Sequence, residues 1–361
     1  MNPRPVRLRL PRRRVAAAAL VATVATLGAT LGATLGGCAV GKSDRTKAPA
    51  AGGSPAERKP TVVLEPTEAQ ESVLNQANTA VDNKEYQTAL ELFRELLAEN
   101  PTLVDAHLGV GRTYEAMGDL PRAEQGYAQA AALDVENFDA QYNHARILSA
   151  MERYGDAVKA FHRALVLRPD SLDANLGMAI AYLKENQAQE ALAFAQKAVE
   201  LAPSDAAARV NLAVAQEKIG RNADAIKSYE TALELAEPKP EVLTSLINLY
   251  AAEKRYVEAI NTANELIRLA PSANAYERLG WAEFRMGQYD KSIAAYRKAV
   301  EMDPSHWPSL NGVATNALNR WLQSGKTDDG ARLEARAAFQ KSLQINPDQP
   351  KVVAILTKYM P

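Results

Sequence analysis

A period of 34 residues runs through most of this chain and constrains its fold more than any other feature. A small residue recurs seven residues after the start of each unit, and another recurs nineteen residues after it. Four residues later most units carry an aromatic residue, and a proline closes most of them. Such self-similarity is typical of one supersecondary unit stacked in many copies. The unit starts are Gln70, Val104, Phe138, Leu172, Ala206, Pro240, Ala273 and Trp307.

Each unit is expected to be a hairpin of two helices. Small residues in both halves let two helices cross closely, and the aromatic side chain fills the space beside the crossing. A left-handed residue is expected to end the first helix, and a polar side chain after the closing proline is expected to cap the next helix. The predicted left-handed residues are Gly118, Asn186, Gly220 and Gly287, and the predicted caps are Thr102, Ser204, Ser272 and Ser305.

This pattern resembles the tetratricopeptide repeat family over residues 70–347, about three quarters of the chain. The resemblance implies an all-α fold, a right-handed superhelical solenoid of about eight helical hairpins. Residues 348–361 space their apolar side chains for one helical face, which predicts the terminal capping helix that an open solenoid needs. Local departures are Ile247 at one crossing, and Ala195 and Ala263 at two aromatic positions.

The N-terminus has the pattern of an export signal. Residues 1–37 combine six arginines with an uncharged run from Val15 to Gly37, as signal peptides do. The run ends in Leu35-Gly36-Gly37-Cys38, which resembles the lipobox of bacterial lipoproteins and implies that Cys38 is acylated. An uncleaved membrane anchor is the alternative, because 23 residues could span a bilayer.

Residues 38–69 are rich in glycine, proline and charged residues, which predicts a disordered tether after the lipidated cysteine. We therefore expect an exported protein that is lipid-anchored to the bacterial envelope. In a cell with two membranes, the resemblance to lipoproteins favours the periplasmic face of the outer membrane, because Ala39 is not the aspartate that often retains lipoproteins at the inner membrane.

Charge argues against nucleic acid as a partner. The chain has 42 Lys and Arg and 43 Asp and Glu, but six of the basic residues and none of the acidic ones lie within residues 1–37. The remainder is therefore acidic by seven charges, whereas binding a phosphate backbone needs clustered cations.

The residues that carry catalysis are missing from the sequence. One cysteine and four scattered histidines exclude a thiolate metal site and intramolecular disulfides. No nucleophile–base arrangement or phosphate-binding loop is present. We expect no catalytic residue, metal, cofactor or small-molecule substrate, and hence no enzyme. His144 occupies an inward packing position and predicts a core imidazole, and residues 325–330 predict a surface loop.

The family resemblance implies that the first helices line a concave groove that receives proteins or peptides. Aromatic residues and arginine dominate such interfaces energetically, and arginine pairs with carboxylates through two hydrogen bonds. The most notable cluster is Trp281 with Phe284 and Arg285, although Trp281 could equally pack on a neighbouring helix. The candidate partner-binding residues are Arg112, Tyr142, Arg146, Lys184, Asn248, Trp281, Phe284 and Arg285.

We therefore expect a protein-interaction scaffold that binds proteins through this groove and the membrane through Cys38. A regulatory or targeting subunit of a separate envelope enzyme, such as a glycosyltransferase or peptidoglycan hydrolase, is the first alternative. A solenoid that binds glycans or small ligands is the second, and would need an aromatic platform from Tyr142, Trp281 and Phe284. Fold alone does not decide among them.

Overall fold

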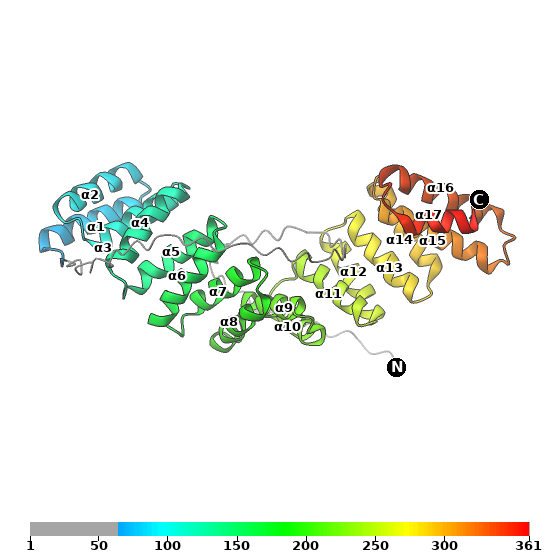
Figure 1. Ribbon diagram of the computed structural model, residues 1–361, viewed down its shortest axis with the longest axis horizontal. Coiled ribbons are helices and arrows are strands. Elements are labelled where there is room, and N and C mark those ends of the chain that lie inside the picture. Colours follow the sequence, from blue (N-terminus) through cyan, green and yellow to red (C-terminus); the bar gives the residue numbers. More distant parts are fainter. Residues whose placement is uncertain (1–63, 361) are drawn as a thin grey trace, which may run out of the picture. The chain divides into compact units, whose positions relative to one another are not determined.

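The computed structural model describes residues 64–360, where every regular element is an α-helix (Figure 1). Cys38, the predicted export signal and most of the predicted tether lie outside these residues. No helix within 64–360 combines the length and the apolarity needed to cross a bilayer. The helices are α1 (Glu68–Asp82), α2 (Tyr86–Glu99), α3 (Val104–Ala116), α4 (Leu120–Leu133), α5 (Phe138–Ala150), α6 (Tyr154–Leu167), α7 (Leu172–Lys184), α8 (Ala188–Leu201), α9 (Ala206–Lys218), α10 (Asn222–Leu235), α11 (Pro240–Ala252), α12 (Tyr256–Leu269), α13 (Ala273–Arg285), α14 (Tyr289–Met302), α15 (Trp307–Gln323), α16 (Asp329–Ile345) and α17 (Pro350–Tyr359).

The helices pack in chain order. Each odd-numbered helix up to α15 pairs with the even-numbered helix that follows it, and each even-numbered helix packs against the next odd-numbered one. Helices α3 to α15 of the first halves begin at the unit starts that the repeat period predicts, and α1 begins at Glu68, two residues before Gln70. The expected all-α solenoid of helical hairpins with a C-terminal capping helix is therefore confirmed.

The first helix of a unit ends in a left-handed residue, as predicted. Gly118, Asn186, Gly220 and Gly287 have φ between 58° and 80°. The same backbone conformation occurs at the equivalent position of three other units, where Lys84, Glu152 and Lys254 stand. These three were not predicted, because neither lysine nor glutamate favours that conformation.

The predicted helix caps are right at one position and wrong at three. The Ala275 N–H donates to Ser272 Oγ at 3.2 Å, so Ser272 caps α13. The residue before α3, α9 or α15 is not the predicted Thr102, Ser204 or Ser305 but the residue after it. One extra residue separates the closing proline from the next helix in these units, whereas Ser272 adjoins its helix directly.

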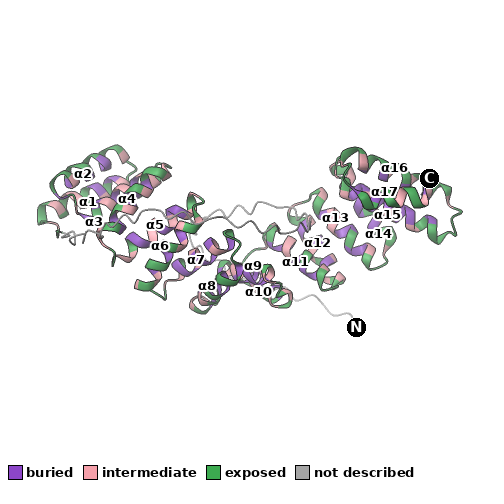
Figure 2. Cartoon of the chain, in the orientation of Figure 1, coloured by how far each residue is buried: buried purple, intermediate pink, exposed green. Residues whose placement is uncertain are grey.

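Small and aromatic positions make the core, which runs along the inside of the hairpins (Figure 2). A Cβ added to Gly111 would lie 2.8 Å from Tyr127 Cδ1, so the aromatic ring fills the space that the small residue of its own unit leaves. A Cβ added to Gly109 would overlap Phe93 Cζ, so a ring also packs on the first helix of the next unit. The buried aromatic residues of this series are Phe93, Tyr127, Phe161, Tyr229, Tyr296 and Phe339.

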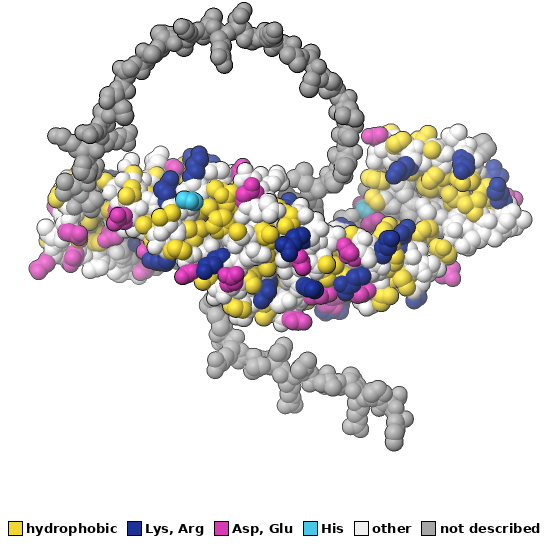
Figure 3. Space-filling model, turned by 60° about the horizontal axis from the view of Figure 1, so that its bottom comes forward, with side chains coloured by type: hydrophobic (Ala, Val, Ile, Leu, Met, Phe, Trp, Pro, Cys, Tyr) yellow, Lys and Arg dark blue, Asp and Glu magenta, His cyan; other side chains and the backbone are white. Residues whose placement is uncertain are grey.

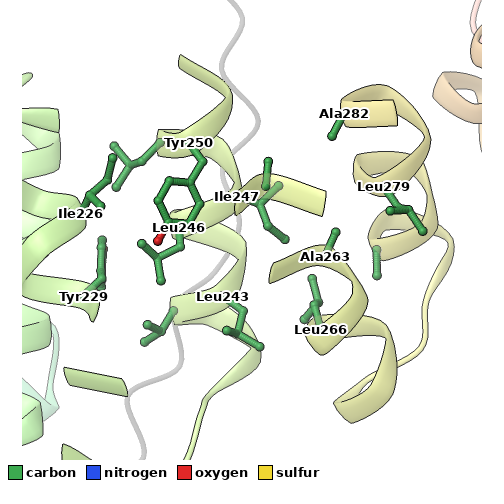
Figure 4. Close-up of a cluster of buried hydrophobic side chains, with 14 of the residues drawn as sticks. Ile226, Tyr229, Leu243, Leu246, Ile247, Tyr250, Ala263, Leu266, Leu279 and Ala282 are labelled. Atoms are coloured by element: carbon green, nitrogen blue, oxygen red, sulfur yellow. The ribbon is translucent and has the colours of Figure 1, made fainter. Parts of the chain in front are cut away.

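The sixth unit exchanges volume between its two core positions. Ile247 stands where other units have a small residue, and Ala263 stands where they have an aromatic ring. Both are buried in one hydrophobic cluster, in which side chains of α11 pack toward α10 on one side and α12 on the other (Figure 4). The large residue on the first helix thus fills the space that the missing ring would occupy.

The eighth unit closes the array. Helices α15 and α16 have 17 residues each. The predicted loop 325–330 joins them only as far as Asp328, because Asp329 and Gly330 already belong to α16. Asp328 in this loop caps α16 and also accepts a hydrogen bond from Arg320 Nε at 3.1 Å. Val352 of α17 and Met360 after it are buried in the cluster that contains Trp321 and Phe339. The loop is therefore a fixed connection, and α17 covers the last core.

The first described residue is held by the turn between α2 and α3. The Leu64 N–H donates to Thr102 Oγ1 at 3.3 Å, and the Leu64 carbonyl accepts from Asn100 Nδ2 at 3.2 Å. Asn100 is buried. Two residues of one turn thus hold the backbone of Leu64 from both sides.

Candidate functional surface

Odd-numbered helices of successive units contact one another at five of the unit junctions, from α1 with α3 to α13 with α15. Among the described helices, successive even-numbered helices approach each other less. The exposed and half-buried side chains of α1, α3, α5, α7, α9, α11, α13 and α15 therefore form a shared surface, the first-helix face.

All eight candidate partner-binding residues lie on these helices. They do not form one site, because they are spread from α3 to α13. On these helices Arg112, Lys184, Asn248, Trp281 and Arg285 are exposed, and Tyr142, Arg146 and Phe284 are half-buried.

Arg146 is held by a carboxylate of the preceding unit. Its two terminal nitrogens each donate to a different oxygen of Glu115, and the Tyr127 hydroxyl also donates to Glu115, at 2.8 Å. Burial opposes ionisation of Glu115, but the hydrogen bond and charge of Arg146 and the hydrogen bond of Tyr127 outweigh it, so the pKa of Glu115 lies below its usual value. This network joins α3, α4 and α5.

Two further arginines join successive first helices. Arg112 Nη2 donates to Asn78 Oδ1 at 2.8 Å, from α3 to α1. Arg278 Nη1 donates to Asn248 Oδ1 at 2.5 Å, from α13 to α11. Several polar side chains of the first-helix face are thus already engaged within the chain.

Tyr142 packs into the core on one side. Its ring stacks on Phe138 with 5.7 Å between centroids and an interplanar angle of 4°. It also meets Phe161 at 6.2 Å. Burial is the main reason that the pKa of Tyr142 is raised, with the Asp173 charge adding to it. Only part of this ring is available to a partner.

An aromatic and cationic cluster lies at the junction of the sixth and seventh units. Trp281 and Tyr256 of α12 form a T-shaped aromatic pair, with 5.8 Å between ring centroids and an interplanar angle of 69°. Arg285 donates to the Tyr256 hydroxyl at 3.1 Å and lies 5.9 Å from the Trp281 ring centroid. Phe284 points to a different contact, Tyr289, at 5.3 Å. Trp281 therefore packs on a neighbouring helix, as the alternative predicted, yet it keeps 36% of its surface exposed.

Sequence reasoning missed the carboxylates that face this surface. Glu115 and Glu217 each accept a hydrogen bond from a tyrosine twelve residues later, Tyr127 and Tyr229. In the units with phenylalanine at that position, Phe93 and Phe161, no glutamate stands twelve residues earlier. Tyr296, the third tyrosine of the series, has Phe284 twelve residues earlier. The pairing of tyrosine with glutamate at this spacing, present in two of the three units, was the signal that could have found them.

The histidine predicted to lie in the core is only partly satisfied. His144 Nε2 lies 3.3 Å from Glu124 Oε1, whereas the buried Nδ1 has no hydrogen-bond partner in the protein. Burial is the main cause that lowers the pKa of His144. Among the described residues no three His, Cys, Asp or Glu side chains are placed to hold a metal ion.

An open groove of about 370 Å³ lies on the other side of the units, between α6 and α8. Leu165, Val166 and Phe194 line it over a floor that includes Met178. On the face shown in Figure 3, basic and acidic side chains are interspersed, and hydrophobic side chains gather between them. Neither basic nor acidic side chains form a continuous patch on the described part of this face.

Three family models, all described as tetratricopeptide repeat, match residues 80–147, 142–206 together with 210–274, and 273–306. Together they span more than half of the chain. The chain belongs to the tetratricopeptide repeat family. Proteins of this family serve as scaffolds that bind other proteins and peptides, and they are generally adaptors without enzymatic activity.

Similarity to curated tetratricopeptide proteins is confined to part of each chain. Heat shock protein STI1 of Saccharomyces cerevisiae is 30% identical over 118 residues, which cover 30% of this chain and 20% of that protein. Small glutamine-rich tetratricopeptide repeat-containing protein 2 of Mycosarcoma maydis is 39% identical over 59 residues, 16% of this chain and 17% of that protein. The chain thus matches about a fifth or less of the length of these relatives.

Solved structures resemble the fold at low identity. The pilF protein of Pseudomonas aeruginosa is 19% identical, with a TM-score of 0.49 over 58% of this chain and 96% of that chain. A tetratricopeptide repeat protein of Parabacteroides merdae is 15% identical, with a TM-score of 0.49 over 69% of this chain and 99% of that chain.

Proposed function

We propose that this protein is a membrane-anchored scaffold of the bacterial cell envelope, which binds other proteins through its first-helix face. The family supports the binding function, and the lipobox at Cys38 with the following tether supports the anchor and the export. The acyl chains of Cys38 would hold the protein at the membrane, and multiple acyl chains anchor stably where one does not.

The observation that carries the binding function is the first-helix face itself. Eight units present this face, and on it Trp281 and Arg285, which both contact Tyr256 of α12, combine exposed aromatic area with a guanidinium. Residues of these types contribute most of the energy of protein interfaces. Trp281 packs on Tyr256 and still keeps 36% of its surface exposed, so its ring is held in position for a partner.

Affinity capture from detergent-solubilised membranes tests the binding function. The native chain is compared with a Trp281→Ala/Arg285→Ala variant, and Leu333→Ala, on exposed α16 surface, is the matched control. We expect one partner set with the native chain and the control, and its loss with the double variant. Identical captures with all three chains would remove Trp281 and Arg285 from the binding surface, and no enrichment with any chain would remove the scaffold function.

The anchor is tested separately. In a bacterial host fed an alkyne-labelled palmitate, we expect label on the native chain and none on a Cys38→Ser variant. Label on both chains, or on neither, contradicts acylation at Cys38.

A further inference from the structure

The repeat places two equivalent carboxylate sites on the first-helix face, three units apart. Glu115, Tyr127 and Arg146 form the first, and the residues 102 positions later form the second. The tyrosine and the glutamate recur, but the arginine does not. The second set is Glu217, Tyr229 and Asn248.

The first site shows how this arrangement binds a guanidinium. Arg146 reaches from α5 and donates both terminal nitrogens to Glu115 on α3. The Tyr127 hydroxyl holds the same carboxylate from α4. Glu115 and Arg146 keep only 25% and 31% of their side-chain surface exposed. The site therefore aligns a half-buried carboxylate with a two-pronged cation.

The second site has the same carboxylate without the cation. The Tyr229 hydroxyl donates to Glu217 Oε2 at 2.9 Å, from the buried core position of α10. Among the described residues, no Lys or Arg forms an ion pair with Glu217. The neighbouring Lys218 is exposed, and Arg278 is hydrogen-bonded to Asn248 instead. Burial is the main cause that raises the pKa of Glu217, against smaller opposing effects of Tyr229, Ser245 and Lys218.

The surroundings of the second site are also less polar. Val214 stands at the position equivalent to Arg112, and Val210 lies one turn before it. Both are partly buried and pack on the core cluster of the sixth unit. Ile180 occupies the corresponding position of α7 and is half-buried. Aliphatic side chains around a half-buried carboxylate lower the local dielectric constant. The attraction between that carboxylate and an opposite charge is therefore stronger than in water.

We propose that Glu217 binds an arginine side chain of a partner polypeptide, which takes the place that Arg146 takes at Glu115. This inference rests on the proposed scaffold function and names the chemistry of its partner: an arginine flanked by aliphatic residues, which contact Ile180, Val210 and Val214. Arginine is selected over lysine because its planar fork matches both carboxylate oxygens, whereas an ammonium is a single point charge.

Two capped peptides test the proposal directly. One is Ala-Val-Arg-Val-Ala with a fluorophore, and the other carries citrulline, which is uncharged and nearly isosteric, in place of arginine. By fluorescence polarisation with the full chain, we expect the arginine peptide to bind about tenfold more tightly. Glu217→Gln should abolish that difference, and Glu253→Gln, on an exposed position, should leave it unchanged. Equal affinity of the two peptides, or no binding of either, overturns the proposal.

A second experiment needs no partner. Asn248→Arg places a guanidinium at the position equivalent to Arg146. Because Arg278 contacts residue 248, the quantity measured is the coupling between Asn248→Arg and Glu217→Gln in a double-mutant cycle of thermal unfolding. We expect Asn248→Arg to raise the midpoint more in the native chain than in the Glu217→Gln variant, and to weaken binding of the arginine peptide. Zero coupling shows that the site does not accept a guanidinium and overturns the proposal.

The same variants separate this inference from the scaffold function. If native and Glu217→Gln chains capture the same membrane partner equally, the scaffold stands and the arginine site is wrong. If the arginine peptide binds as expected but no membrane partner is captured, the site stands and the scaffold function fails.

Discussion

At the scale of single residues, two glutamates in equivalent positions have opposite effects on stability. The pKa of Glu115 lies below its usual value and that of Glu217 lies above it. Ionised Glu115 therefore stabilises the fold above its unfolded pKa, and this stabilisation is lost as the pH falls through the folded pKa. Ionisation of Glu217 lowers the free energy of unfolding. This loss disappears as the pH falls through the raised pKa of the folded state and below about 4.5, the ordinary pKa of a glutamate.

We accordingly expect Glu115→Gln to lower the free energy of unfolding at pH 7 by about 2 kcal/mol, because a charge-assisted network loses its acceptor. Glu217→Gln should raise the free energy of unfolding at pH 7. Urea denaturation of both variants at pH 7 and pH 4 checks this, and both differences should shrink at the lower pH. If both substitutions changed the free energy of unfolding at pH 7 in the same direction, the opposite roles of Glu115 and Glu217 would be wrong.

The left-handed residues allow a second prediction at this scale. Lys84, Glu152 and Lys254 adopt positive φ with a side chain that disfavours it. Replacing each by glycine should raise the free energy of unfolding by up to about 1 kcal/mol, because relief of the left-handed strain exceeds the added freedom of the unfolded chain. Gly118→Ala, at the equivalent position of the second unit, is the control and should destabilise. A loss of stability in all three glycine variants would refute the argument.

Prediction from sequence succeeded at residues where one property decides the structure. Small core residues such as Ala89 and buried rings such as Phe93 follow from size and spacing alone. The caps at Thr102 and Ser204 failed, because a displacement of one residue along the chain moves a side chain off the helix terminus. Glu217 was missed because an isolated glutamate on a helix resembles any solvated residue until its burial is known.

At the scale of helices, the sixth unit exchanges core volume between two partner positions, with the large residue on the first helix and the small one on the second. Ile247 and Ala263 occupy positions that touch in other units, as Gly111 and Tyr127 do. Ala263→Phe alone should overpack the unit and cost about 1–3 kcal/mol. Combined with Ile247→Ala, it should recover much of that loss.

Chemical denaturation of the two single variants and the double variant checks this exchange. Val257→Phe, on the exposed surface of the same helix, is a matched control and should change stability little. Additive losses from Ala263→Phe and Ile247→Ala would show that the two positions do not share one space.

Helix order and helix starts could be predicted because each unit repeats the same spacing, so that an error in one unit is corrected by its neighbours. The junction of Trp281 with Tyr256 could not, since Tyr256 begins α12 and only the packing of α12 on α13 brings the rings together. Contacts between units depend on geometry that no single repeat encodes.

At the scale of the whole described array, the packing is between neighbours along the chain. In such an array stability is close to a sum of unit and junction energies. Removing α17 by ending the chain after Asp348 should expose the cluster around Trp321 and Phe339 and loosen the eighth unit first. Hydrogen exchange should speed up in α15 and α16 and stay unchanged in α1 to α10. Uniform acceleration along the chain would contradict this one-dimensional behaviour.

The first-helix face, which we propose as the partner-binding surface, could be predicted as a set of helices, but the contacts of its individual side chains could not. The repeat fixes which side of a helix faces the core, whereas exposed residues such as Lys184 and Asn248 are free of that constraint. Such an exposed side chain can be hydrogen-bonded by a residue of the next unit, as Asn248 is by Arg278. Whether this happens depends on the length of the side chains on both sides of the junction.

The two hydrogen bonds at Leu64 have a mechanical consequence. Tension arriving along the preceding chain meets the turn at Asn100 and Thr102 before it reaches the start of α1. Both bonds must break before the load can peel α1 from α2, and Asn100 resists because it is buried between units. We therefore expect a pull at the N-terminal end to load the junction of the first two hairpins before it loads the first helix.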